Sequence, residues 1–180
     1  MRTVMAIGGS PGTGKTMLMR AFMKDKVWET VEPKKTLSAL YCRDLDLYIL
    51  GTYAEGEVFA GTDRLSMAVQ PVLEAWIGTH QSHVLFEGDR VFNQSFLEFL
   101  LTLPDTDVQI VVLTAPKSIL HQRYQDRGSN QSEQFLKGRD TKYSNLMGNF
   151  TLRPYMTTYE HVTPTDQERV LQHLQTTLGR

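Results

Sequence analysis

Short apolar runs alternate with longer segments of mixed polarity along the chain. Four such runs cover residues 4–7, 37–42, 83–86 and 108–113, and helix-length stretches lie between them. Continuous apolar runs are typical of strands buried on both faces, as in a parallel sheet that helices cover on both sides. The pattern therefore predicts an α/β fold built on a parallel sheet.

Further elements follow from periodicity and capping signals. Apolar residues between positions 65 and 77 recur at the spacing of one helix face, with Pro71 expected to kink the helix or mark its first turn and Trp76 expected in the core. Residues 155–162 predict a last strand. Residues 165–178 predict a closing helix that starts at Thr165, with Glu168 three residues later as its capping partner.

Residues 122–148 have a different composition, rich in Arg, Lys, Ser, Asn and Gln and poor in aliphatic side chains. Such a segment predicts a mobile lid instead of core. The whole chain of 180 residues is the size of one domain. We therefore expect a single domain, residues 1–180, with the lid inside it.

The first apolar run leads into Gly-Ser-Pro-Gly-Thr-Gly-Lys-Thr at residues 9–16, a full match to the phosphate-binding loop G-x-x-x-x-G-K-[ST] (P-loop). Glycines let backbone N–H groups surround the phosphates, and the next helix points its positive end at them. We expect Lys15 to reach the β- and γ-phosphates and Thr16 to ligate Mg²⁺. ATP, or another nucleoside triphosphate, would be held by Gly9, Pro11, Gly12, Thr13, Gly14, Lys15, Thr16 and Met17.

Carboxylates follow two of the predicted strands, at the edge where open α/β sheets bind ligands. Asp44 is the candidate for the catalytic base that orients the acceptor hydroxyl, and Asp46 for an acceptor contact; a helix cap or a surface ion pair is the alternative for Asp44. Glu87 is the candidate for a second Mg²⁺ ligand, because a carboxylate at the end of a buried strand needs a partner. Asp89 and Arg90 would face the acceptor.

Arg123 and Arg127 are four residues apart, which places them on one face of the helix that follows the strand at 108–113. They are candidates for balancing charge on the transferring phosphoryl group. Arg139 and Lys142 offer a second basic cluster. A solvated charged surface is the alternative for all four residues.

Aromatic residues, glycines and an acid–base pair interleave between the second and third apolar runs. Aromatic faces can stack on a base, and acidic and basic side chains can read its polar edge. Core packing and helix capping are the alternatives. The acceptor-binding candidates in this segment are Tyr48, Tyr53, Phe59, Asp63 and Arg64.

Composition narrows the partners. The net charge of −1 argues against a basic coat for nucleic acid, although local patches stay possible. Cys42 predicts a buried small side chain, and the pair His80 and His83 is too isolated to indicate a metal site. No stretch approaches the roughly 18 apolar residues of a membrane span, so we expect a cytoplasmic protein without a membrane partner.

These motifs together resemble the nucleoside-monophosphate-kinase-like group of P-loop kinases over most of the chain. The resemblance rests on residues 9–16, Asp44 with Asp46, residues 87–89, and Arg123 with Arg127. It implies five parallel strands in the order 2-3-1-4-5, with ATP and Mg²⁺ at the carboxyl edge of the sheet.

More narrowly, residues 50–53, 59–66 and 86–89 are similar to small bacteriophage kinases of DNA hypermodification, which phosphorylate 5-hydroxymethyluracil within DNA. This resemblance implies a hydroxymethyl acceptor on a base, DNA carrying a modified pyrimidine as partner, and the cytoplasm of a host cell as location. Tyr48, Tyr53 or Phe59 would stack on the base.

Two other functions stay open. A kinase of a free nucleotide, nucleoside or small metabolite needs no DNA track and suits the near-neutral charge better. A nucleotide-dependent switch or assembly ATPase would need a water-orienting residue and a partner surface in place of the lid arginines and an acceptor base.

Overall fold

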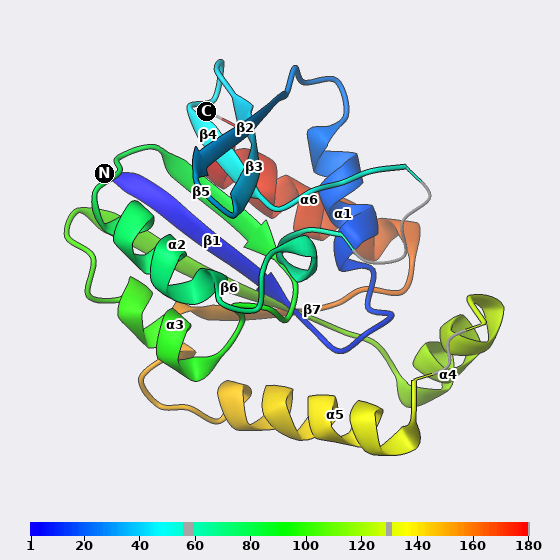
Figure 1. Cartoon of the computed structure of the whole chain (residues 1–180). Coiled ribbons are helices and arrows are strands. Elements are labelled where there is room, and N and C mark those ends of the chain that lie inside the picture. The colour runs from blue at the N-terminus through cyan, green and yellow to red at the C-terminus, as the bar shows by residue number, and fades with distance from the viewer. Residues whose placement is uncertain (56–59, 129–130, 180) are drawn as a thin grey trace.

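A single sheet forms the centre of the computed structural model, which describes residues 1–55, 60–128 and 131–179 (Figure 1). The strands within this described part of the chain are β1 (Arg2–Gly8), β2 (Glu29–Lys34), β3 (Leu37–Cys42), β4 (Leu47–Leu50), β5 (His83–Glu87), β6 (Thr106–Thr114) and β7 (Met156–Glu160). Their order across the sheet is β2-β3-β4-β5-β1-β6-β7.

Strands β4, β5, β1, β6 and β7 run parallel to one another. Numbered among themselves in chain order, these five strands follow the order 2-3-1-4-5, which confirms the expected arrangement. Their carboxyl ends meet at one edge, directly before the P-loop, and this edge positions the site.

The parallel role predicted for residues 37–42 is wrong. These residues form β3, which is antiparallel to both of its neighbours, and the four-residue strand β4 takes the predicted parallel place. The turn between them is tight: the Asp46 amide donates to the Arg43 carbonyl at 3.2 Å, and Asp46 has a left-handed φ of 47°. Such a short strand directly after a turn gives little periodic signal. Residues 43–46 therefore lie at the amino edge of the parallel strands, opposite the P-loop.

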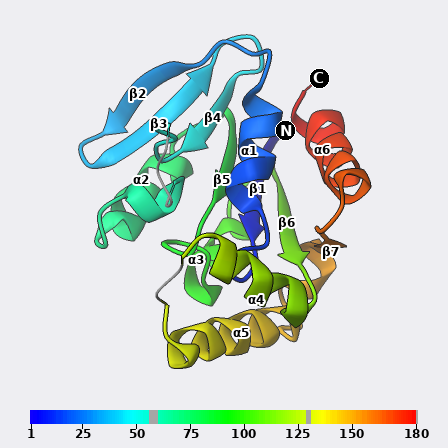
Figure 2. The ribbon, with the colours of Figure 1, turned by 90° about the vertical axis from the view of Figure 1, so that its right-hand side faces the viewer.

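Helices cover both faces of the sheet, as expected (Figures 1 and 2). One layer holds α1 (Lys15–Met23) and α6 (Pro164–Leu178), and the other holds α2 (Val69–Gly78), α3 (Gln94–Leu100) and the last turns of α5 (Glu133–Met147). Helix α4 (Lys117–Asp126) projects beside the P-loop. Two 3-10 turns, η1 (Thr62–Arg64) and η2 (Arg153–Tyr155), complete the elements of the described residues.

Alternation along β1 separates the two cores. Met5 and Ile7 belong to the layer of α1 and α6, whereas Val4 and Ala6 belong to the layer of α2 and α3. All four side chains are fully buried. This double burial explains why the strand is apolar without interruption.

Two predicted helix starts need correction. Helix α6 begins one residue earlier than predicted, because Thr163 and Asp166 form the capping box with Pro164 in the first helical position. Helix α2 begins at Val69 instead of residue 65, and Pro71 lies in its first turn, where a missing N–H costs little. Trp76 is buried, as predicted.

The segment at 122–148 is not polar surface throughout. Its two helical parts are the end of α4 and all of α5, and Tyr143 and Leu146 of α5 are buried in the core. The last turns of α5 are therefore anchored to the body of the molecule.

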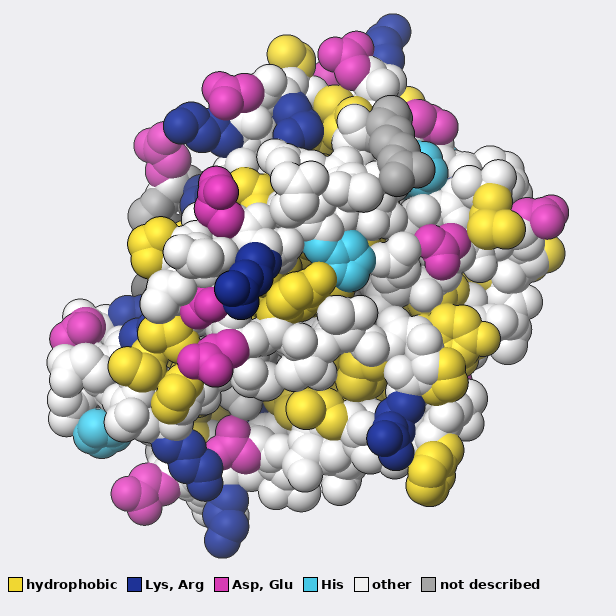
Figure 3. Space-filling model, turned by 180° about the vertical axis from the view of Figure 1, so that it is seen from behind, with side chains coloured by type: hydrophobic (Ala, Val, Ile, Leu, Met, Phe, Trp, Pro, Cys, Tyr) yellow, Lys and Arg dark blue, Asp and Glu magenta, His cyan; other side chains and the backbone are white. Residues whose placement is uncertain are grey.

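The surface carries both signs of charge. On the face seen in Figure 3, Lys and Arg side chains lie among Asp and Glu side chains instead of gathering in one patch. None of the helices described is long and apolar enough to cross a membrane.

Gly51 joins the end of β4 to the segment that leads into η1. It has a φ of +96°, and a Cβ there would collide with the backbone of Gly61. We expect Gly51→Ala to lower the free energy of unfolding by about 1 to 3 kcal/mol, measured by denaturant titration. Gly78→Ala is the control: Gly78 ends α2 with open space around it, so its substitution should leave stability unchanged or raise it. Equal effects of both substitutions would contradict the argument.

Candidate active site

The P-loop connects β1 to α1 and wraps around the first turn of that helix. Gly12 and Gly14 have left-handed φ values of +85° and +87°. A Cβ on Gly14 would lie 2.6 Å from Nδ1 of His161, and one on Gly12 would lie 2.9 Å from the Tyr124 ring. Both positions therefore require glycine for backbone conformation and for space. The arrangement directs the α1 N-terminus into the loop, where it favours an anion.

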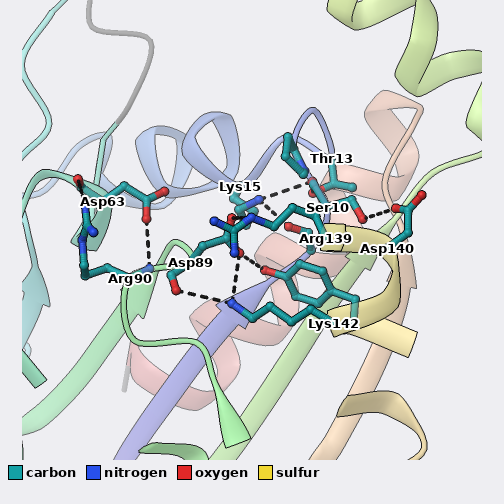
Figure 4. A network of polar contacts seen from close by, with 12 residues as sticks. Ser10, Thr13, Lys15, Asp63, Asp89, Arg90, Arg139, Asp140 and Lys142 are labelled. Atoms are coloured by element: carbon teal, nitrogen blue, oxygen red, sulfur yellow. Dashed lines mark hydrogen bonds and ion pairs between the residues drawn. The ribbon is translucent and has the colours of Figure 1, made fainter. Parts of the chain in front are cut away.

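Lys15, the first residue of α1, lies across the loop (Figure 4). Its Nζ donates to the carbonyl oxygens of Gly9 at 2.6 Å and Ser10 at 3.3 Å. The positive charge is thus held at the P-loop, which in this motif forms an anion-binding concavity.

Glu87 ends β5 with its side chain beside Thr16. The Thr16 hydroxyl donates to Oε1 of Glu87 at 3.0 Å, and the Tyr53 hydroxyl donates to the same oxygen at 3.2 Å. The glutamate is only 2 % exposed. Burial raises the pKa of Glu87 to about 7, although the charge of Lys15 and the hydrogen bond from Thr16 act in the opposite direction.

This pair suits a hard divalent cation. A carboxylate and a hydroxyl are oxygen ligands of the kind Mg²⁺ prefers, and a buried carboxylate with a raised pKa gains from a nearby cation. Among the described residues, no group of three or more His, Cys, Asp or Glu side chains is placed to hold a metal ion. A cation at Thr16 and Glu87 would therefore complete its coordination with phosphate and water oxygens, which is the usual arrangement for Mg²⁺.

A cleft of about 1220 Å³ opens along the P-loop at the carboxyl edge of the sheet. Thr13 is buried beneath it and donates to the Ser10 carbonyl at 2.8 Å. The predicted site residues that line the cleft are Pro11, Gly12, Gly14, Lys15, Thr16, Met17, Asp63, Arg64, Glu87, Asp89, Arg90, Arg123 and Arg127.

Arg123 of α4 and Arg127, which directly follows this helix, lie by the P-loop in different ways. Arg123 donates to the carbonyl oxygens of Gly12 at 2.5 Å and His161 at 3.2 Å. The Tyr124 hydroxyl donates to the Pro11 carbonyl at 2.6 Å. Arg127 is exposed and lines the cleft, with its guanidinium 5.8 Å from the centre of the Tyr124 ring. The Arg123 guanidinium is thus held by backbone carbonyl oxygens, whereas the Arg127 side chain is exposed in the cleft.

Asp63 belongs to η1 and lines the cleft. Its Oδ1 accepts from the Arg90 amide at 3.0 Å, and the Arg90 guanidinium donates to the Asp63 carbonyl at 3.2 Å. Burial raises the pKa of Asp63, and the negative charge of Asp89 raises it further. A carboxylate whose proton affinity is increased in a cleft is suited to accept a proton from a ligand.

Asp89 ties α5 to the end of β5 (Figure 4). Its carboxylate accepts from the Tyr143 hydroxyl and pairs with Lys142 at 3.6 Å and Arg139 at 3.7 Å. The Ser10 hydroxyl donates to Asp140 at 3.0 Å, so the same helix also contacts the P-loop. The Asp89 carboxylate therefore has three side-chain partners from α5. The Asp63 carboxylate instead accepts a hydrogen bond from the backbone amide of Arg90.

Three candidates from the sequence lie elsewhere. Asp44 is exposed in the β3–β4 turn, and Asp46 in the same turn accepts from Tyr41 at 2.9 Å and Ser82 at 2.6 Å. Tyr48 packs with its ring centre 5.2 Å from that of Trp76. Their placement near the P-loop is wrong, because the antiparallel direction of β3 carries this turn to the opposite edge.

The other two aromatic candidates differ from each other. Tyr53 contacts Glu87 through its hydroxyl but is not part of the cleft lining. Phe59 lies outside the described residues.

Several cleft residues escaped the sequence reasoning. Phe135 of α5 and a group after β7 line the cleft, and Nδ1 of His161 donates to the Thr13 carbonyl at 2.6 Å. The rule that ligands bind after parallel strands, applied to the predicted last strand, could have found the second group. That group comprises His161, Val162, Thr163, Pro164 and Gln167.

We compared the sequence and the fold with those of known proteins. Residues 1–179 match the sequence profile described as P-loop Nucleotide Kinase3. No curated protein matches the chain. Three solved structures cover nearly all of the chain at low sequence identity.

The sugar kinase from Janibacter sp. HTCC2649 is 15 % identical with a TM-score of 0.53, over 99 % of this chain and 95 % of that one. A gluconokinase from Sinorhizobium meliloti 1021 is 14 % identical with a TM-score of 0.48, over 98 % of each chain. A shikimate kinase from Acinetobacter baumannii is 19 % identical with a TM-score of 0.48, over 99 % and 94 %. At such identity the first of these shows a shared fold and nothing more.

The raised pKa of Glu87 has a consequence for stability. A carboxyl group with a folded-state pKa of about 7, against 4.5 as its ordinary value, stabilises the fold below pH 4.5, and this stabilisation is lost as the pH rises to about 7. Glu87→Gln keeps the uncharged shape. Between pH 5 and pH 8 the variant should gain about 2 to 3 kcal/mol of unfolding free energy relative to the wild type, measured by denaturant titration without metal ions. A difference independent of pH would contradict the assignment.

Asp63 lines the cleft and Asp44 does not, so the two carboxylates are expected to differ in their effect on turnover. Asp44→Asn should leave turnover unchanged, because its side chain lies at the far edge of the sheet. Asp63→Asn, which keeps an oxygen for the Arg90 amide, should lower kcat by about 100-fold or more and leave nucleotide binding intact. Steady-state kinetics and nucleotide titration of both variants test this, and a large loss in Asp44→Asn alone would restore the original candidate.

Proposed function

Because the chain belongs to the P-loop nucleotide kinase family, we propose that it transfers the γ-phosphate of ATP to a hydroxyl group of a small acceptor. The observation that carries this proposal is the cleft itself. Lys15 and the Thr16–Glu87 pair lie on its P-loop side, Asp63 faces them, and Arg127 lies above. These are the groups that phosphoryl transfer needs to hold a donor, orient an acceptor and balance charge.

The donor would lie along the P-loop. Backbone N–H groups of the loop and the α1 N-terminus bind the phosphates, and Lys15 neutralises charge on the β- and γ-phosphates. The cleft continues to residues 161–167, which offers the nucleoside end a place between α4 and α6. Thr16 and Glu87 would hold Mg²⁺, which supplies positive charge to the β- and γ-phosphate oxygens.

The acceptor hydroxyl would lie beside Asp63. As the hydroxyl oxygen bonds to the γ-phosphorus, its proton passes to the Asp63 carboxylate, and the bond from that phosphorus to the β,γ-bridging oxygen breaks to leave ADP. Arg127 stabilises negative charge on the transferring group. We also propose that residues 122–148 act as the lid, with α4 and the first turns of α5 moving and the buried end of α5 as anchor.

A small free acceptor, such as a nucleotide, nucleoside or metabolite, fits best. The net charge is −1, and the three solved structures that share this length are kinases named for a sugar, gluconate and shikimate. The cleft is also large enough for a nucleotide and a second small molecule together.

The second candidate is 5-hydroxymethyluracil within DNA, which the sequence resemblance implies. One structural feature favours it. Because β3 is antiparallel to β4, the β2–β3 turn lies at the same edge of the sheet as the cleft, and it carries Lys34 and Lys35. Two lysines could contact a phosphate backbone but provide only a small part of the charge that DNA binders use.

We expect labelled γ-phosphate from ATP to appear on a free small acceptor, and Lys15→Ala to lower this transfer at least 100-fold while the variant stays folded by circular dichroism. The assay compares deoxynucleosides, deoxynucleoside monophosphates, gluconate and shikimate with duplex DNA that contains or lacks 5-hydroxymethyluracil.

Each outcome decides between candidates. Label only on the modified duplex would establish the DNA kinase. ATP hydrolysis without label on any acceptor would instead support a nucleotide-dependent switch or assembly ATPase. Full transfer by folded Lys15→Ala would reject the assignment of the P-loop.

A further inference from the structure

Phe135 presents an aromatic side chain to the cleft. It lies in the first turn of α5, lines the cleft and is 40 % exposed. The helix buries Tyr143 and Leu146 at its other end, so Phe135 is not needed for the core. A large apolar side chain on the wall of a ligand cleft is typical of a surface that a ligand covers.

Arg139 lies one turn after Phe135 in α5 and carries a planar guanidinium group. The Arg139 guanidinium lies over the Phe135 ring, 4.8 Å from its centre, and it lines the same cleft. Its ion pair with Asp89, at 3.7 Å, is longer than a hydrogen bond, and Asp89 already has Tyr143 and Lys142 as partners. Arg139 can therefore turn toward a ligand without leaving Asp89 uncompensated.

The place of this pair in the cleft indicates what it contacts. Asp89 joins α5 to the end of β5, next to Asp63 and Arg90, and residues 161–167 line the cleft from α6 and the loop before it. Arg139 thus lies on the side of the cleft that holds Asp89, Asp63 and Arg90, and the Phe135 ring lies against its guanidinium.

The chemistry of the pair favours a planar ring. A phenyl ring offers no hydrogen bond to the hydroxyls of a sugar or polyol, whereas a phenyl ring and a guanidinium both stack on the face of a heterocycle. In the same cleft, Asp63 and Arg90 can bind the polar edge or the hydroxyl of the same molecule.

We infer that Phe135 and Arg139 form a stacking platform for a nucleobase, and that the acceptor is a nucleoside or nucleotide. This inference rests on the proposed kinase function and specifies its acceptor. It distinguishes the chain from kinases whose acceptors are sugars or polyol acids.

The test uses Phe135→Leu, which keeps an apolar side chain but removes the ring. The aromatic probes are the four common deoxynucleosides, their 5′-monophosphates and 5-hydroxymethyl-2′-deoxyuridine; the other probes are glucose, gluconate and shikimate. For any aromatic acceptor that receives label, Phe135→Leu should raise the acceptor KM about tenfold and leave the KM of ATP unchanged. Phe135→Tyr and Phe135→Trp should restore the wild-type KM.

Phe150→Leu is the matched control. Phe150 is 85 % exposed, has Arg153 at 5.7 Å from its ring centre and does not line the cleft. The same chemical change there should leave every constant unaltered. An equal rise in KM for both variants would overturn the platform.

Failure of the platform and failure of the kinase proposal give different results. Label only on non-aromatic acceptors, or a Phe135→Leu effect on the KM of ATP alone, would overturn the platform and keep the kinase. If no probe receives label, calorimetric titration of the aromatic probes in the presence of MgADP decides: binding that Phe135→Leu weakens supports the platform without the proposed reaction, and no binding rejects both.

Discussion

The register between β1 and β5 is the constraint on which the site depends. The parallel pairing sets Ile7 beside Glu87, so the first strand enters the P-loop at the level where the other strand ends in its carboxylate. Thr16 can then donate to Glu87 at 3.0 Å, although the two residues are 71 positions apart. A shift by one residue would turn Glu87 to the other face of the sheet and leave the Thr16 hydroxyl without its acid.

Helix α5 connects the P-loop to the end of β5. Asp140 contacts Ser10 of the P-loop, whereas Tyr143, Lys142 and Arg139 hold Asp89 at the end of β5. Polar groups that are fixed before a ligand arrives need no reorganisation during the reaction, which is the main source of electrostatic catalysis in phosphoryl transfer. The helix is anchored by Tyr143 and Leu146 in the core. The polar residues of α5 therefore lie on its exposed side, while its buried residues fix the helix to the core.

The antiparallel strands β2 and β3 explain why the sequence pattern places Asp44 and Asp46 at the wrong edge of the sheet. The β3 run is as apolar as a parallel strand, because α2 covers it and it contributes Leu37 and Ala39 to the core. Burial produces the same sequence pattern in either direction, so the pattern at 37–42 could not show that the strand runs backwards. The pattern therefore predicts Asp44 at the carboxyl edge of the sheet, whereas Asp44 lies in the β3–β4 turn at the opposite edge. Asp63, which lines the cleft, belongs to a short 3-10 turn with no periodic signal.

Features that depend on local chemistry could be predicted from the residues alone: the P-loop, whose glycines, lysine and threonine lie within eight residues, and the acid at the end of β5. The order of the parallel strands followed from the family resemblance. The three-dimensional structure was needed to show that Asp63 lines the cleft and Asp44 does not, because this depends on the direction of β3 and on the backbone amide of Arg90, which donates to Asp63. It also brings Phe135 and Arg139 of α5 to the wall of the same cleft. Contacts between residues far apart in the chain depend on strand direction and helix anchoring, and neither leaves a local pattern in the sequence.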